Sequence, residues 1–267
     1  MTTPMTPERE RELVELGRRL YEAERARRAV PQISSGRPWL GAAEAYRVQQ
    51  EVVRRRMAGG ETIVGWKIGL TSEAMRRQLG VDQPDYGPIL SGYLVPPGAT
   101  IVVDDLIQPR IESEIAFVLR SPLRGPGVTA VDVLAATDGV AAALEIIDSR
   151  IEGWKLTLPD TIADLASSAR VAWSGRLVPA DSLDLRAITV VLRRAGEVVG
   201  EGIGGAVLGD PAEAVAWAAN TLAEFGVTME AGHLIMPGAL HASVPAKGGD
   251  MFEAQFEGLG GVSARFV

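Results

Sequence analysis

Arg110-Ile-Glu-Ser-Glu-Ile-Ala-Phe-Val-Leu119 has the alternation of a β-strand whose two faces differ in chemistry. Because successive side chains of a strand point to opposite faces, Glu112 and Glu114 share one face, with Ala116 and Val118 further along it. The other face is apolar and carries Ile111, Ile115, Phe117 and Leu119. Two neighbouring carboxylates at the edge of an apolar surface repel each other and lose solvation, so a compensating group is expected nearby.

A third carboxylate, Glu145, lies in a second apolar run, Ala143-Leu-Glu-Ile-Ile147. A divalent cation among the three glutamates would offset their repulsion, and all-oxygen ligands suit a hard ion such as Mg²⁺ or Mn²⁺. A Glu-x-Glu pair on a strand is also common as a solvated face. The pattern alone therefore leaves a metal site and a plain polar surface open, although Glu145 among Leu and Ile is hard to place in water.

The composition restricts the class of protein. The chain of 267 residues is 46% hydrophobic, which is enough for a substantial core, and its net charge of −7 argues against a nucleic-acid-binding surface. It has no cysteine, which excludes disulfides, and only two histidines, which disfavours a tetrahedral zinc site. No apolar run has the length of a transmembrane helix, and the first residues include no apolar signal segment. We therefore expect a cytoplasmic protein with no membrane or nucleic-acid partner.

Two helices are predicted over residues 6–28 and 42–58, with Thr6 as N-cap and Pro7 at the first helical position. From Thr62 the sequence changes to short β-type runs. Further helices are predicted over 73–79, 130–137 and 211–225, and residues 84–88 are predicted to be a loop. Strands are predicted at 62–69, 99–103, 111–119, 143–148, 170–174, 187–194, 198–202, 233–236, 251–256 and 261–266. Since strands and helices do not alternate, an α+β fold with a mixed, β-rich domain is favoured over a doubly wound parallel sheet.

Several polar residues outside the glutamates are candidates for chemistry. Lys67 lies in an apolar run, where it can extend to the surface or approach an anion. Asp85 lies in a Pro/Gly-rich segment, where a turn hydrogen bond is the ordinary role. Ser167 and Ser168 can hydrogen-bond a ligand, and His241 is a candidate for the rim of a site.

Six segments, taken together, resemble a known family. They are Gly65-Trp-Lys-Ile-Gly-Leu-Thr-Ser72, Leu79-Gly-Val-Asp-Gln-Pro-Asp-Tyr-Gly87, Gln108-Pro-Arg-Ile-Glu-Ser-Glu-Ile-Ala-Phe117, Ala143-Leu-Glu-Ile-Ile-Asp-Ser-Arg150, Pro159-Asp-Thr-Ile-Ala-Asp164 and Gly258-Leu-Gly-Gly-Val-Ser-Ala-Arg-Phe266. In this order they are similar to the 2-keto-4-pentenoate hydratase group. This group lies within the fumarylacetoacetate hydrolase superfamily and also contains 4-oxalocrotonate decarboxylases.

The resemblance implies a fold and a set of site residues. It implies a mixed β-roll like the superfamily's C-terminal domain over residues 61–267, with residues 1–60 as a helical extension. The metal, Mg²⁺ or Mn²⁺, is expected on Glu112, Glu114 and Glu145. The expected catalytic residues are Lys67, Asp85 and Ser167. The residues expected to bind the substrate are Leu70, Ser168 and His241.

The resemblance also implies an activity. The chain is expected to add water to a 2-hydroxy-2,4-dienoate, the enol of an unsaturated 2-oxo acid, and so to give a 4-hydroxy-2-oxo acid. Pro84-Asp-Tyr-Gly87 is typical of one set of hydratases, whereas decarboxylases, and some hydratases too, more often carry Ile in place of Asp85. The motif therefore favours a hydratase and leaves a decarboxylase open. A C–C hydrolase is disfavoured because such enzymes use a histidine on the N-terminal side of the catalytic domain, and none precedes His233.

Two alternatives stay open at this point. One is decarboxylation of a 2-oxo acid of the 4-oxalocrotonate type. The other is a non-catalytic partner subunit of such an enzyme, because Leu165 stands where the family usually has Asn. His241 also stands where the family has a small residue, and both departures leave the precise substrate open. Family members form homo-oligomers, so a homo-oligomer is expected here, with a complex with a related pathway enzyme as a further option.

Overall fold

The computed structural model describes residues 6–73, 76–77, 80–96 and 98–267. The helices in this part of the chain are α1 (Pro7–Ala26), α2 (Ala42–Ala58), α4 (Ala130–Ala136), α5 (Leu158–Ala163) and α6 (Pro211–Glu224). The strands are β1 (Ile63–Gly69), β2 (Asp85–Leu90), β3 (Leu94–Val95), β4 (Thr100–Ile101), β5 (Arg110–Leu119), β6 (Thr137–Ile147), β7 (Ser168–Trp173), β8 (Thr189–Arg194), β9 (Glu197–Ile203), β10 (Leu234–Met236), β11 (Val244–Pro245), β12 (Met251–Phe256) and β13 (Gly260–Phe266).

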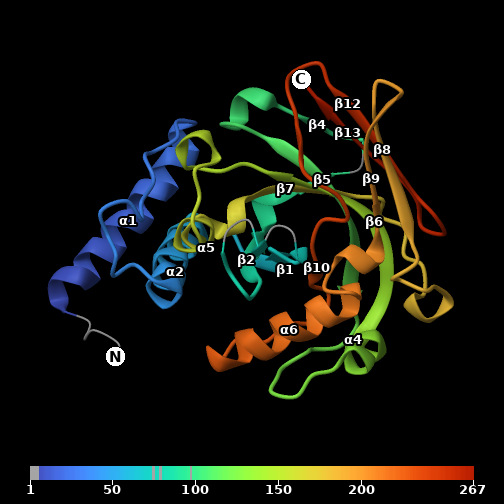
Figure 1. The fold of residues 1–267 in the computed structure, drawn as a ribbon, viewed down its shortest axis with the longest axis horizontal. Coiled ribbons are helices and arrows are strands. Elements are labelled where there is room, and N and C mark those ends of the chain that lie inside the picture. The colour runs from blue at the N-terminus through green and yellow to red at the C-terminus, as the bar shows by residue number, and fades with distance from the viewer. Residues whose placement is uncertain (1–5, 74–75, 78–79, 97) are drawn as a thin grey trace.

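The strands form two sheets within the described residues. One has the order β2-β1-β10-β5-β6-β7-β3, with β11 paired to β5, and the other has the order β4-β13-β12-β8-β9. Most pairs are antiparallel, but β1 pairs with β10, β3 with β7 and β4 with β13 in parallel. The two N-terminal helices lie on the side of the molecule away from β8, β9, β12 and β13 (Figure 1). This arrangement confirms the predicted α+β fold with a β-rich roll and N-terminal helices.

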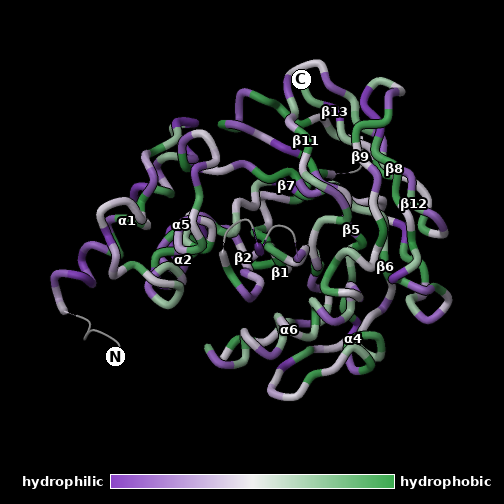
Figure 2. Tube along the Cα trace, in the orientation of Figure 1, coloured by the Kyte–Doolittle hydropathy of each residue, from purple (hydrophilic) through white to green (hydrophobic). Residues whose placement is uncertain are grey.

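Both faces of β5 are buried, each in its own hydrophobic cluster. Ile111, Ile115 and Phe117 pack in the cluster that the two sheets share with α6, whereas Ala116 and Val118 pack in the cluster that includes α1 and α2. The predicted assignment of residues to the two faces is therefore confirmed. Hydrophobic stretches follow β1 and β5 through the middle of the molecule, while α1 is mostly hydrophilic (Figure 2). The glutamates of β5 belong to the face that looks toward the N-terminal helices.

The N-terminal helices form as their sequences indicate. Thr6 Oγ1 accepts a hydrogen bond from the N–H of Arg9 at 3.3 Å, and Pro7 is the first residue of α1. Helix α2 spans Ala42–Ala58, as predicted, and Gly59 is its C-cap. The apolar stripe of α1, with Leu13, Leu16 and Leu20, is buried in the cluster that also contains α2. No helix in the described part of the chain combines the length and the apolar character needed to cross a membrane.

One predicted element is wrong in a way that matters for the site. Residues 84–88 were expected to be a loop, but Asp85–Leu90 form β2, which pairs antiparallel with β1. Strand β2 is the outermost strand of its sheet and has only one neighbouring strand, β1. Pro88, which has no N–H to donate, can therefore be accommodated there. The short elements β3, β11 and α5 were not predicted, and β6 begins earlier than expected, at Thr137. The predicted helix at 73–79 falls largely outside the described residues.

Candidate functional site

Three glutamates meet on β5 and β6. Glu112 and Glu145 are direct cross-strand partners, and Glu114 lies two residues further along the same face of β5. Directly opposed side chains on antiparallel strands have Cβ atoms about 5 Å apart, so the pairing register itself brings the carboxylates together. One oxygen of each glutamate lies within 4.8 Å of the other two.

Glu114 and Glu145 are buried with few partners, and Glu112 is partly buried. The N–H of Gly238 donates to Glu114 Oε2 at 2.8 Å, but Glu114 Oε1 and both oxygens of Glu145 have no hydrogen-bond partner. Burial raises the pKa of Glu112 to about 7. Burial, and then the charge of Glu145, raise the pKa of Glu114 well above its usual range. Three clustered carboxylates, two of which have buried oxygens without a hydrogen-bond partner, are the donor set of a hard divalent cation, so these residues fit such an ion.

Lys67 on β1 is the cation that lies among these carboxylates. It is buried, with Nζ 3.4 Å from Glu145 Oε2, and it donates to the carbonyl of Ala166 at 2.9 Å. Burial lowers the pKa of Lys67, but the charges of Glu145 and Asp85 outweigh burial and the net pKa is raised. Lys67 is therefore a buried ammonium, not the surface-reaching lysine that the sequence left open.

The carbonyl that Lys67 binds belongs to an unusual turn. Leu165, Ala166 and Ser167 have φ of 58°, 49° and 58°, the left-handed region that non-glycine residues rarely occupy. Asp164 holds this turn: it accepts a hydrogen bond from Ser167 Oγ at 3.2 Å and pairs with the buried Arg150, whose Nε lies 2.6 Å away. Such strain persists only where the surroundings over-determine it, and here it presents Ala166 O and Ser167 to the site.

Asp85 lies at the start of β2, opposite Gly69 on β1. Its Oδ2 accepts from Thr161 Oγ1 on α5 at 3.0 Å, and its Oδ1 has no partner. Burial raises the pKa of Asp85, and the charge of Lys67 and the hydrogen bond of Thr161 lower it in part. A Cβ at position 69 would lie 2.2 Å from Asp85 Oδ1, so glycine is required there to leave room for the carboxyl group.

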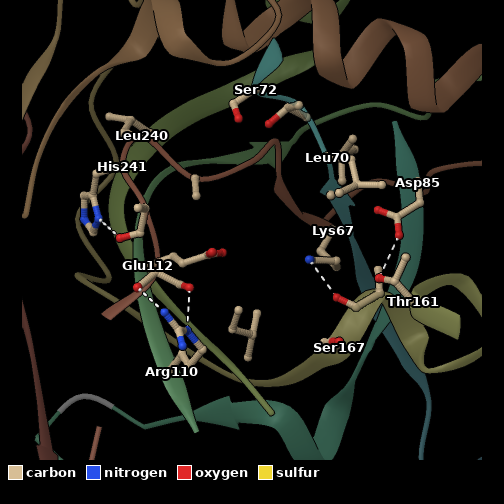
Figure 3. A pocket seen from close by; sticks show the side chains of 18 of the residues that line it. Lys67, Leu70, Ser72, Asp85, Arg110, Glu112, Thr161, Ser167, Leu240 and His241 are labelled. Atoms are coloured by element: carbon tan, nitrogen blue, oxygen red, sulfur yellow. Dashed lines mark hydrogen bonds between the residues drawn. The ribbon is translucent and has the colours of Figure 1, made fainter. Parts of the chain in front are cut away.

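Lys67, Asp85, Glu112 and Ser167 line one cavity of about 570 Å³. Lys67 and Asp85 lie on one side of it and Glu112 and Arg110 on the opposite side (Figure 3). Glu112 faces the cavity, while Glu114 and Glu145 lie behind it and do not line it. Arg110 is held by Ser243, whose Oγ is 2.7 Å from Arg110 Nε.

The residues predicted to bind substrate fall in different places. Leu70 lines the cavity in a left-handed conformation with φ of 58°. His241 also lines the cavity. Its Nδ1 is 2.9 Å from the carbonyl oxygen of Ala242, so Nδ1 carries the ring proton and donates it. Nε2 then accepts a hydrogen bond from Ser113 Oγ at 2.8 Å. Ser168 does not line the cavity; it is fully buried and its Oγ has no hydrogen-bond partner. Direct substrate contact by Ser168 is therefore unsupported.

Thr161 is a cavity residue that the sequence reasoning did not single out. It lies in α5, whose start is a capping box in which Asp160 accepts from Thr157 N and Oγ1. The Thr-x-x-Asp spacing of residues 157–160 was the available signal for this helix. The side chain of Leu165, in contrast, packs in the cluster with the N-terminal helices and does not line the cavity.

Known proteins match the chain along most of its length. It is 44% identical to 2-hydroxyhexa-2,4-dienoate hydratase of Comamonas testosteroni over 94% of this chain and 96% of that protein. It is 45% identical to 4-oxalocrotonate decarboxylase of Pseudomonas sp. strain CF600 over 89% of this chain and 90% of that protein. Overall identity therefore does not separate the two activities.

A solved structure has the same fold over nearly the whole chain. It is 4-oxalocrotonate decarboxylase from Pseudomonas putida G7 complexed with magnesium and adipate, with a TM-score of 0.94, 42% identity and coverage of 99% of both chains. Residues 70–267 match the fumarylacetoacetate (FAA) hydrolase C-terminal family. With the roll and the relatives in agreement, the chain belongs to the fumarylacetoacetate hydrolase C-terminal family.

Proposed function

We propose that this protein is a metal-dependent hydratase that adds water to a 2-hydroxy-2,4-dienoate and gives a 4-hydroxy-2-oxo acid. The observation that carries the proposal is the cluster of Glu112, Glu114 and Glu145, which has unpartnered oxygens and lies beside a cavity that also holds Lys67 and Asp85. The relatives named as hydratases act on substrates of this class.

The three glutamates would hold a divalent cation, with Mg²⁺ as the first candidate and Mn²⁺ as the second. When bound, such an ion supplies Lewis-acid stabilisation for charge that develops on the C2 oxygen of the substrate. The magnesium complex of the structural relative from Pseudomonas putida G7 supports this choice.

Lys67 would hold the anionic head of the substrate. Nζ donates to Ala166 O and lies 3.4 Å from Glu145 Oε2 without a hydrogen bond to it. An ammonium group has three N–H donors, so Nζ retains donors for the ligand. Ser167 has a different role, because its hydroxyl donates to Asp164. Its oxygen can then accept a hydrogen bond from the cavity, which suits the positioning of the attacking water rather than of a carboxylate.

Asp85 would carry the proton transfers. The first moves a proton from the C2 hydroxyl to C5 and gives a conjugated enone; in the second, water adds at C4 and C3 is protonated. A carboxyl group with a raised pKa is suited to accept a proton and return it. Thr161 fixes Oδ2 by a hydrogen bond, so the unpartnered Oδ1 is left for this exchange.

A product experiment tests the proposal. The protein is incubated with 2-hydroxypenta-2,4-dienoate, and in parallel with 2-hydroxyhexa-2,4-dienoate, with and without Mg²⁺, and the products are identified by NMR. We expect the 4-hydroxy-2-oxo acid in the presence of Mg²⁺ only. An absence of this product with both dienoates would remove the hydratase assignment.

Decarboxylation is the second candidate, because a decarboxylase is as similar in sequence as a hydratase and another shares the fold at a TM-score of 0.94. Release of CO₂ from a 2-oxo-enedioate separates the two reactions. Asp85 in place of Ile supports the hydratase. The partner-subunit alternative rested on Leu165, and that side chain does not line the cavity. The homo-oligomer, the complex with a related enzyme and the cytoplasmic location stay predictions.

A further inference from the structure

Gln49 joins the N-terminal helices to the site. It lies on α2, outside the range 70–267 that matches the family, and only 4% of it is exposed. Its Nε2 is 2.9 Å from the carbonyl of Tyr86 and 2.8 Å from the carbonyl of Ile162. Both neighbours are carbonyl oxygens, which only accept hydrogen bonds, so the side-chain atom of Gln49 that lies between them is the amide nitrogen. Each of its two hydrogens is donated to one of these carbonyls.

Both carbonyls belong to places where backbone groups lack regular partners. Tyr86 is on β2, the outermost strand of its sheet, and Ile162 is in the last turn of α5. Edge strands present unpaired backbone groups, and the last carbonyls of a helix have no partner within the helix. A single amide therefore ties an edge strand to a helix end, two elements that the Thr161–Asp85 hydrogen bond also joins.

The two tied residues each follow a residue of the site. Tyr86 follows Asp85, and Ile162 follows Thr161, whose Oγ1 is 3.0 Å from Asp85 Oδ2. We propose that Gln49 is a positioning residue: it holds β2 and α5 at the separation at which Thr161 donates to Asp85. The catalytic consequence rests on the proposed function, whereas the clamp itself is a statement about the fold.

The kinetic test uses Gln49→Leu, which keeps the size of the side chain and removes the donors, and Gln50→Leu as its control. Gln50 is the next residue of the same helix and is exposed. We expect Gln49→Leu to lower kcat on the order of tenfold or more with little change in KM. Lys67, proposed to hold the substrate, and the glutamates, proposed to hold the metal, are not touched. Gln50→Leu should retain the wild-type kcat.

A double-mutant cycle separates positioning from a general loss of stability. In a Thr161→Val background the hydrogen bond to Asp85 is already absent, so Gln49→Leu should change kcat less than about twofold there. Equal factors in both backgrounds would overturn the proposal, because they would mean that Gln49 does not act through Thr161. If Gln49→Leu is not obtained folded, Gln49→Asn replaces it, since its amide is one methylene too short to reach both carbonyls.

Hydrogen–deuterium exchange tests the clamp without any turnover. Gln49→Leu should speed amide exchange in peptides that cover 85–90 and 158–163 and leave 110–119 unchanged, and Gln50→Leu should change none of them. Unaltered exchange in 85–90 and 158–163 would refute the clamp. If the wild-type protein hydrates no dienoate, the proposed function fails, but the exchange result still decides whether Gln49 ties the two elements.

Discussion

Among single residues, Glu114 of the glutamate cluster allows a direct test of the proposed metal site. Glu114 is buried, one of its oxygens is bound by Gly238 and the other has no partner. Glu114→Gln should lower kcat on the order of a hundredfold, because it removes one ligand charge from the metal site. The same change should raise the melting temperature of the metal-free protein, since it replaces a buried carboxyl group, which must either bind a proton or repel its neighbours, with a neutral amide.

Activity assays and thermal melts of metal-free and Mg²⁺-loaded protein check this pair of effects. Glu253→Gln serves as the control, because Glu253 is an exposed glutamate on β12. A wild-type rate for Glu114→Gln would remove this residue from the site. A lower melting temperature in the metal-free state would show that the carboxylate stabilises the fold by some other contact.

Thr161 is one of the groups that act on the pKa of Asp85, after burial and the charge of Lys67. The Thr161 hydrogen bond lowers the pKa of Asp85 against the effect of burial, so Thr161→Val should raise that pKa further. If ionised Asp85 activates the water, the acidic limb of the kcat/KM profile should move to higher pH. A pH–rate profile measures this shift, with Thr221→Val as control, because the Thr221 hydroxyl bonds within α6 to Trp217 O. An acidic limb that stays in place would exclude Asp85 as its origin.

At the level of elements, the long periodic segments could be predicted and the short ones at the site could not. Helices α1, α2 and α6 have caps and apolar stripes that act locally, so their sequences are sufficient. Strand β2 has Pro88 and Gly87, which indicate a loop when read alone, and only its place at a sheet edge makes it a strand. The turn at 165–167 carries no glycine, and it is held by Arg150 and Asp164, contacts that a local reading does not include.

The contact between β2 and this turn can be tested at Gly87. A Cβ at that position would lie 2.4 Å from the carbonyl oxygen of Leu165, which is backbone and cannot rotate away. Gly87→Ala should therefore push the turn from β2, move Ala166 O relative to Lys67, and cost about 1–3 kcal/mol in the free energy of unfolding. The free energy of unfolding, measured by denaturant titration, and kcat should both be lower than in the wild-type protein. Gly248→Ala is the control, because its Cβ would meet nothing closer than 3.4 Å; equal behaviour of the two variants would contradict the predicted clash.

For the whole molecule, the sequence predicted the fold class and the faces of β5, but not how the strands are ordered. Two strand pairings bring the site residues together. Glu112 on β5 is the cross-strand partner of Glu145 on β6, and β1 pairs with β10 although the two strands are far apart in the chain. Neither follows from local patterns, and both are needed to bring Lys67 to the glutamates. The division at residue 60 stays a prediction, and the Gln49 contacts mean that residues on its N-terminal side touch the backbone beside the site.

The metal-free protein should lose stability as the pH rises. Glu112 and Glu114 have folded-state pKa values above their ordinary ones, with that of Glu112 at about 7, so the folded state binds protons that the unfolded state has released. Their stabilising contribution is complete below the ordinary glutamate pKa and is lost as the pH rises through the folded pKa, at about 1.4 kcal/mol for each pKa unit. Mg²⁺ should remove this dependence, because a bound ion takes the place of the protons and adds about 2.7 kcal/mol at a hundred times its Kd. Melting temperatures between pH 5 and about 8, with EDTA and with Mg²⁺, measure both effects. A metal-free protein that is as stable at the alkaline end as at pH 5, together with unchanged activity after exhaustive chelation, would mean that these carboxylates are already compensated and hold no cation.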